Sequence, residues 1–210
     1  MANLPPTKSN LIATKRSREL AETGFDLMDK KRNLLVRELV ALIDQAKDIQ
    51  DRTENTFSAA YAALSRAAIS MGGHDRLRLL AHYAIEKDEG IGLKYRSVMG
   101  VELPAVTSGE IRMDTLPYGL LATTSVLDDA YVKFRKAKQL IMDLAETENA
   151  IFRLAYAIKK TQKRANALKN IVIPNLDATA QQIIDDLEEK EREEFVRLKV
   201  IKAQQRSREE

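Results

Sequence analysis

The chain has 210 residues, of which 44% are hydrophobic, 5% aromatic and 31% charged, a balance typical of long amphipathic helices. A net charge of only +3 argues against a general nucleic-acid binder, and the absence of cysteine excludes disulfides and thiolate metal sites. No apolar run approaches the roughly 18 residues that cross a bilayer, and residues 1–6 lack a signal peptide's apolar stretch, so we expect an intracellular protein without direct membrane insertion.

The first arm of the chain, residues 1–71, is predicted to be one long helix. Pro5 and Pro6 stop a helix from extending backwards, and Thr7 or Ser9 can cap the helix that follows. Apolar residues then recur with the 3–4 spacing of a helix that buries one stripe. They are Met28, Leu35, Leu39, Leu42, Ala46 and Ile49.

The middle segment, residues 72–123, holds seven of the eight glycines and is predicted to be a small domain. A short helix is expected over residues 75–87. The stretch from Ile91 to Pro104 predicts a bent β-strand, residues 107–109 a turn, and residues 110–113 the returning strand of a hairpin.

The second arm, residues 124–210, is predicted to be another long helix. Apolar residues recur every eleven positions in two rows, which are Leu154, Ala165, Leu176, Leu187 and Leu198, and Ile151, Gln162, Ile173, Ile184 and Phe195. Eleven residues in three turns predict a right-handed or nearly straight coiled coil. Pro174 removes a backbone hydrogen bond, so a kink or local unwinding is expected beside it.

Each arm exposes an apolar stripe that must be covered, and the middle segment lets the chain return. The predicted fold is therefore mainly α: a long antiparallel two-helix coiled coil of the N- and C-terminal helices, with a small middle domain containing a short helix and a β-hairpin. A compact helical bundle is the alternative, which the length of the second arm disfavours.

The sequence carries no recognisable catalytic chemistry. It contains no phosphate-binding glycine motif, and its two histidines, His74 and His82, have no partners at metal-ligand spacing. No serine nucleophile has a nearby base. We therefore predict no catalytic, cofactor-binding or metal site.

Charge is more informative than chemistry near the two ends of the chain. In an antiparallel hairpin both termini lie at the same end, which predicts a basic tip that fits an acidic surface. Its members are Lys8, Lys15, Arg16, Arg18, Arg197, Lys199, Lys202, Arg206 and Arg208. Solvated charge on fraying helix ends is the alternative interpretation.

Several sequence blocks, in order along nearly the whole chain, resemble the D subunit of the rotary vacuolar/archaeal-type (V/A-type) ATPases. The most specific are Thr161-Gln162-Lys163-Arg164-Ala165-Asn166-Ala167-Leu168 and Ile173-Pro174-Asn175-Leu176. Further matches are Pro6 to Leu11, Ser97 to Val101 followed by Pro104, and Glu191 to Phe195. The chain departs from the family pattern around residues 72–92.

This resemblance implies a non-catalytic central-stalk rotor shaft, cytoplasmic and peripheral to the membrane. Its paired helices would enter the ring of A and B subunits, its middle domain would lie beside the small F subunit, and its base would sit in the funnel-shaped subunit that caps the membrane rotor ring. The shaft would couple ATP hydrolysis or synthesis to H+ or Na+ transport.

Two sets of contact residues follow from this assignment as hypotheses. The basic tip is expected to meet the A/B ring. The hairpin is expected to lie near the F subunit through Val98, Met99, Val101, Ile111 and Met113. A free-standing coiled-coil scaffold or tether is the main alternative, and a nucleic-acid-binding hairpin is disfavoured by the low net charge and by the lack of interleaved aromatic residues.

Overall fold

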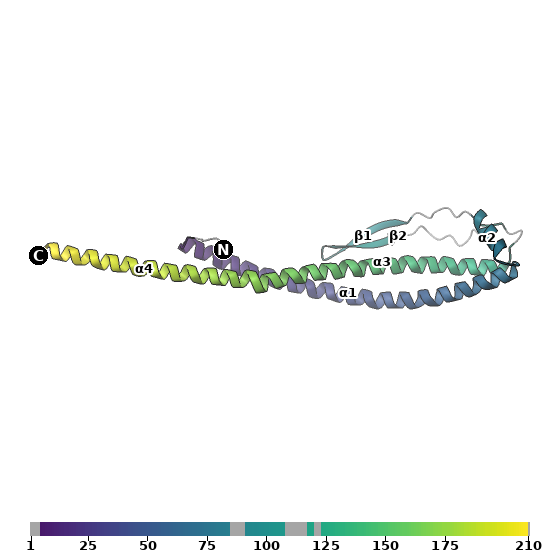
Figure 1. Ribbon diagram of the computed structural model, residues 1–210, viewed down its shortest axis with the longest axis horizontal. Helices are drawn as coiled ribbons and strands as arrows, with labels where there is room; N and C mark the ends of the chain where they lie inside the picture. Colours follow the sequence, from purple (N-terminus) through teal and green to yellow (C-terminus); the bar gives the residue numbers. More distant parts are fainter. Residues whose placement is uncertain (1–4, 85–90, 108–116, 120–122, 210) are drawn as a thin grey trace. The chain divides into compact units, whose positions relative to one another are not determined.

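The computed structural model describes residues 5–84, 91–107, 117–119 and 123–209 (Figure 1). Its elements, in chain order, are α1 (Lys8–Ser70), α2 (His74–Tyr83), β1 (Gly92–Val98), β2 (Val101–Thr107), α3 (Ser125–Ala167), the π-helical turn η2 (Leu168–Val172) and α4 (Ile173–Glu209). Two compact units result: a terminal unit of Met1–Asn33 with Lys159–Glu210, and a central unit of Leu34–Ile158.

The ends of α1 follow the signals in the sequence. Thr7 Oγ1 accepts a hydrogen bond from the Asn10 N–H at 3.2 Å, which confirms the predicted cap. At the other end Gly72 and Gly73 have φ angles of 80° and 125°, a region that glycine enters without steric cost. The Gly73 N–H bonds the Ala68 carbonyl at 2.9 Å and closes the helix.

In the terminal unit, the start of α1 packs antiparallel against α4 and the end of α3. Residues later in α1 meet residues earlier in the second arm, as an antiparallel pair requires. The cross-helix contacts are Lys8–Glu191 at 3.2 Å, the ion pair Arg18–Asp177, and Arg32–Gln162 at 2.8 Å.

The π-helical turn η2 ends two residues before Pro174, in the region where local unwinding is expected from the sequence. Its defining bond runs from the Ile173 N–H to the Leu168 carbonyl, five residues back instead of four. The turn also shifts the covered stripe by one residue. Covered positions are Thr161, Ala165 and Leu168 before it, and Ile173, Leu176, Ala180, Ile183 and Leu187 after it. If the 3–4 spacing of a regular α-helix continued after Leu168, the next covered positions would be Val172 and Asn175, but both are exposed.

The eleven-residue rows predicted the covered face correctly for most of their length. Leu154 and Ala165 are buried, and Leu176 and Leu187 are half-buried. The last members of both rows, Leu198 and Phe195, are exposed. The hand of the supercoil stays a prediction.

In the central unit, α1 and α3 again run antiparallel, as the hydrogen bond between the Ser70 and Thr124 hydroxyls and the edge-to-face contact of Tyr61 with Phe134 indicate. Two buried clusters hold them together. One is Leu35, Leu42, Leu103, Ala150 and Leu154. The other is Ala63, Ala67, Met71, Leu127 and Ala130, where small side chains let the backbones approach closely.

The hairpin was predicted, but its turn was placed wrongly. The turn of the observed hairpin lies at Met99–Gly100, so β1 pairs with β2 in a register that joins Val98 to Val101. Thr107, where the predicted turn began, ends β2, and residues 108 and 109 lie outside the described residues. Both turn residues have positive φ, 51° and 75°, as the type I′ turn favoured by two-residue hairpins requires. The predicted returning strand, residues 110–113, lies outside the described residues.

Candidate functional surfaces

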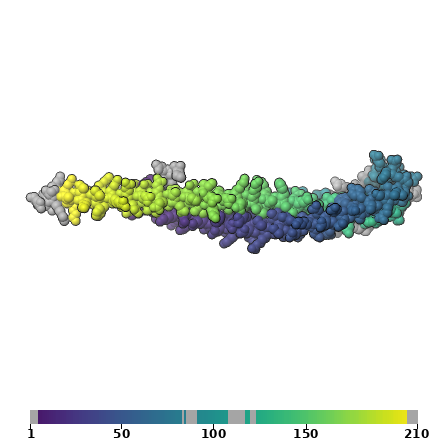
Figure 2. Space-filling model, turned by 60° about the horizontal axis from the view of Figure 1, so that its bottom comes forward, coloured from purple at the N-terminus to yellow at the C-terminus, as the bar shows by residue number. Residues whose placement is uncertain are grey.

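The C-terminal end of α4 carries an uncovered apolar surface. Positions 192–204 are all exposed, and among the described residues nothing packs across the helix beyond the Lys8–Glu191 ion pair. Within the terminal unit, α4 continues past the point where α1 begins (Figures 1 and 2). The exposed apolar side chains are Phe195, Val196, Leu198, Val200 and Ile201, between 51% and 70% accessible.

Basic charge accompanies this apolar surface. Residues 195–204 contain Arg197, Lys199 and Lys202 and no acidic residue. Arg197 forms an ion pair one turn back with Glu193, at 3.7 Å. Such an exposed pair contributes little to stability, so the end of α4 is held by its own helical hydrogen bonds. The surface can bind a partner that offers both apolar contacts and negative charge.

The structure does not bring all the predicted basic residues together. Lys8 pairs with Glu191, and Arg18 pairs with Asp177 and Glu22. Asp177 precedes Arg197 by twenty residues, about 30 Å of helix, so Arg18 belongs to a different part of the surface. Lys15, Arg16, Lys199 and Lys202 are exposed, whereas the side chains of Arg206 and Arg208 lie outside the described residues.

The hairpin lies against the helix pair of the central unit, and its face toward the helices is well packed. Leu103 is fully buried in the first cluster, and Val98 and Val101 pack against the same cluster. These two predicted contact residues therefore turn inward. Met99, at the tip of the turn, is exposed, while the predicted Ile111 and Met113 lie outside the described residues.

The outer face of the hairpin carries residues that sequence reasoning did not single out. Leu93 and Tyr95 are 59% and 57% exposed, and the Arg153 guanidinium lies 5.4 Å from the Tyr95 ring. The alternation of β1 could have identified them only with the correct turn, because moving the turn changes which residues pair and which face they occupy. The outer face thus offers an apolar surface beside a strand edge.

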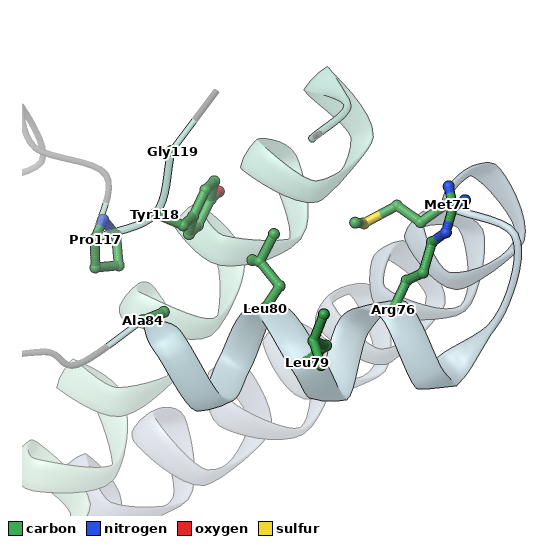
Figure 3. A pocket seen from close by; sticks show the side chains of 8 residues that line it. All are labelled: Met71, Arg76, Leu79, Leu80, Ala84, Pro117, Tyr118 and Gly119. Carbon is green, nitrogen blue, oxygen red and sulfur yellow. The ribbon is translucent and has the colours of Figure 1, made fainter. Parts of the chain in front are cut away.

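A third surface is the apolar hollow beside α2 (Figure 3). It encloses about 450 Å³ and is lined by Met71, Arg76, Leu79, Leu80, Ala84, Pro117, Tyr118 and Gly119. A neighbouring hollow of about 300 Å³ shares Leu80, Ala84, Pro117 and Tyr118 and continues over α3 to Phe134. Both are open to one side, which suits an apolar side chain of a partner better than an enclosed ligand.

Tyr118 ties the chain beside this hollow to the start of α3. Its hydroxyl donates a hydrogen bond to Asp128 Oδ1 at 2.8 Å, and its ring packs edge-to-face on Tyr131. Burial, the hydrogen bond and the nearby carboxylate raise the pKa of the Tyr118 phenol well above its usual value. The Tyr118 phenol therefore stays protonated near neutral pH, and its hydrogen bond and ring contact hold the chain beside the hollow against α3.

Within the described part of the chain, no three histidine or acidic side chains are grouped as a metal site would require. No helix among the described residues is long and apolar enough to cross a bilayer.

Comparison with known proteins identifies the family. The model of the family of ATP synthase D subunits matches residues 10–203. The chain is 42% identical to the D subunit of the V-type ATP synthase of Thermotoga neapolitana, over 95% of this chain and 97% of that protein. It is 34% identical to the D subunit of the A-type ATP synthase of Methanosphaera stadtmanae, over 94% and 92% of the two chains, and 34% identical to that of Pyrococcus horikoshii, over 95% and 94%. The chain therefore belongs to the family of ATP synthase D subunits.

Proposed function

We propose that this chain is the central-stalk rotor shaft of a V/A-type ATPase or ATP synthase. It would transmit torque between the catalytic A/B ring and the membrane ion-translocating rotor, and so couple ATP hydrolysis or synthesis to H+ or Na+ transport. The observation that carries the proposal is the uninterrupted α1, 63 residues or about 95 Å long, with antiparallel helix packing in each compact unit. Membership in the family of ATP synthase D subunits supports it.

The three surfaces suit three partners of such a shaft. The exposed apolar and basic end of α4 suits the inside of the A/B ring, since shallow contacts allow a shaft to slide between ring positions. The hairpin suits the F subunit. The open hollow beside α2 suits the funnel-shaped subunit that caps the membrane rotor ring, because apolar side chains of that protein could fill it.

The chain itself is proposed to be non-catalytic. The described residues offer helix faces, a strand edge and open hollows instead of an enclosed site with grouped acids and bases. Nucleotide chemistry would belong to the ring, and the complex would be attached to the membrane through its other proteins.

Single-molecule rotation tests this proposal. The A/B ring, assembled from the same organism's proteins, is fixed to a surface, and a bead is attached to a cysteine introduced at Arg76 beside the hollow. Addition of ATP should turn the bead stepwise in one direction. A chain that binds no A/B ring, or a ring whose ATP turnover leaves the bead still, would overturn the proposal.

Removal of the hairpin, with residues 92–107 replaced by a short glycine-serine linker, tests the assignment of the F subunit. Its binding should be lost while α1 and α3 remain paired through the second buried cluster. Retained binding of the F subunit together with an unchanged ATPase rate would refute this part of the proposal. Circular dichroism verifies that the helices are intact.

A further inference from the structure

The register of the hairpin determines which main-chain groups point away from it. A two-residue turn makes Val98 and Val101 a hydrogen-bonded pair. Hydrogen-bonded pairs alternate with pairs that are not hydrogen-bonded to each other, so Arg96–Leu103 and Lys94–Ala105 are bonded as well. The main-chain groups of the intervening residues therefore point outward. They are Leu93, Tyr95 and Ser97 on β1, and Glu102, Pro104 and Val106 on β2.

Side chains of α3 bind two of the outward main-chain groups of β2. The Val106 N–H donates to Glu146 Oε2 at 2.7 Å, and the Glu102 carbonyl accepts from the Arg153 guanidinium at 3.0 Å. Between these two anchors lies Pro104, which has no N–H to offer. No further strand can pair along this edge, because α3 and a proline close it.

Within the described ranges, nothing pairs with the outer edge of β1. Among the described residues, no hydrogen bond reaches the outward N–H or carbonyl of Leu93, Tyr95 or Ser97, and all three residues are exposed. Unpaired main-chain groups in a row form a template for an added strand. The contrast with β2 indicates that this hairpin blocks one edge and leaves the other free.

The charges beside this edge restrict what can pair with it. Lys94 and Arg96 alternate with the outward residues, and Arg96 lies only 3.6 Å from Glu38 of α1. Another copy of β1 would bring like charges into opposition, which is unfavourable. A strand with an acidic residue opposite Lys94 would be favoured, and its apolar residues could pack on Leu93 and Tyr95.

We propose that β1 accepts an extended segment of a partner protein, carrying an acidic residue, as a third strand along its open edge. This inference rests on the proposed function and specifies how the hairpin holds its partner there: by main-chain hydrogen bonds to Leu93, Tyr95 and Ser97. The F subunit is the partner used to test it.

Residue-resolved amide exchange, with and without the F subunit, tests the strand addition. In the free chain the outward amides of Leu93, Tyr95 and Ser97 should exchange fast, while the inward amides of Lys94 and Arg96 are protected by β2. In the complex the outward amides should slow at least about tenfold, as new hydrogen bonds form. A bound F subunit with all three outward amides still exchanging fast would overturn the inference.

Ser97→Pro gives an independent test with a close control. Proline at this position removes only an outward N–H, as Pro104 already does on β2, so the hairpin should persist. Binding of the F subunit should weaken at least about tenfold in Ser97→Pro and less than about twofold in Ser97→Ala. Equal binding of the F subunit by both variants would refute the strand addition but not the proposed function. A wild-type chain that does not bind the F subunit would refute both the strand addition and this part of the proposed function.

Discussion

At the scale of single residues, stability depends on a few large side chains among many alanines. Leu35, Leu103 and Leu154 are the largest side chains that are fully buried. They come from α1, β2 and α3 and meet in one cluster, so each helps to hold three elements together. The rest of the core is mostly small, which makes these leucines hard to replace.

Leu154→Ala should therefore lower the free energy of unfolding by about 2–5 kcal/mol, because the packed neighbours relax only partly into the cavity that it leaves. Phe152→Ala, two residues away, is the matched control. That side chain is 73% exposed and its loss should change stability by less than about 0.5 kcal/mol. Urea unfolding followed by circular dichroism measures both, and equal losses would contradict the described packing.

Tyr118 predicts a pH effect on stability. The folded state raises the pKa of its phenol above the unfolded value of about 10, so folding favours the protonated form. This contribution is fully present below about pH 10 and is lost as the pH rises toward the higher folded pKa. The thermal midpoint of the wild-type chain should fall more steeply above pH 10 than that of Tyr118→Phe.

The exposed Tyr156 supplies the comparison for this measurement. Tyr156→Phe should keep the steep wild-type dependence, because its phenol stays in water in both states. Tyr118→Phe should also lose the hydrogen bond to Asp128, which costs about 1 kcal/mol at neutral pH. Parallel pH profiles for all three proteins would show that Tyr118 is not held as described.

At the scale of elements, the long helices could be predicted from the sequence and the hairpin only in part. Proline and glycine mark the ends of α1, and the apolar spacing marks its buried face, since both are local signals. The hairpin turn was misplaced because Met99–Gly100 lacks the Asn-Gly signature of such turns. Pro104 suggested the end of a strand, but β2 continues past it. A proline fits at this position because its nitrogen points away from β1 and no hydrogen bond to β1 is lost.

The candidate surfaces were predictable to different extents. The apolar and basic residues of α4 could be identified by type, but their exposure depends on where α1 begins opposite them. The difference between the two hairpin edges could not be found, because it depends on the register and because the α3 side chains that close the β2 edge are about forty to fifty residues away in sequence. The π-helical turn was foreseen only as local unwinding near Pro174.

The π-helical turn leads to a prediction about deletions. It contains one residue more than an α-helical turn, which shifts the covered stripe from Leu168 to Ile173. Deleting the exposed Ile171 together with Pro174→Ala should convert the turn to α-helix and keep Ala180 and Ile183 covered. The thermal midpoint should stay near that of the wild type.

Deleting the exposed Gln181, again with Pro174→Ala, provides the contrast. The chain is equally short, but this deletion rotates every later residue by about 100° and moves Ile183 and Leu187 off the covered face. Each apolar side chain exposed in this way costs about 1.5–3 kcal/mol. Similar thermal midpoints for the two deletions would show that the π-helical turn does not determine which residues of α4 are covered.

At the scale of the whole molecule, folding and assembly should depend on different parts of the chain. The described contacts that hold α4 end at Glu191, while its exposed apolar surface begins at Phe195. A chain that ends at Arg192 should therefore unfold within about 0.5 kcal/mol of the full chain. It should nevertheless fail to bind the A/B ring, which size-exclusion chromatography and the ring's ATPase rate would measure.

Two double substitutions separate the apolar from the electrostatic part of this contact. Phe195→Ala with Leu198→Ala removes apolar area from the surface and should weaken ring binding at every salt concentration. Lys199→Gln with Lys202→Gln should weaken it at low salt and flatten its salt dependence, because exposed charges are screened over about 8 Å at physiological ionic strength. Neither pair should alter stability, since all four side chains are exposed. If the truncated chain bound the ring as tightly as the full chain, α4 beyond Arg192 would have no part in assembly, and the contact would have to lie on the covered helix pair instead.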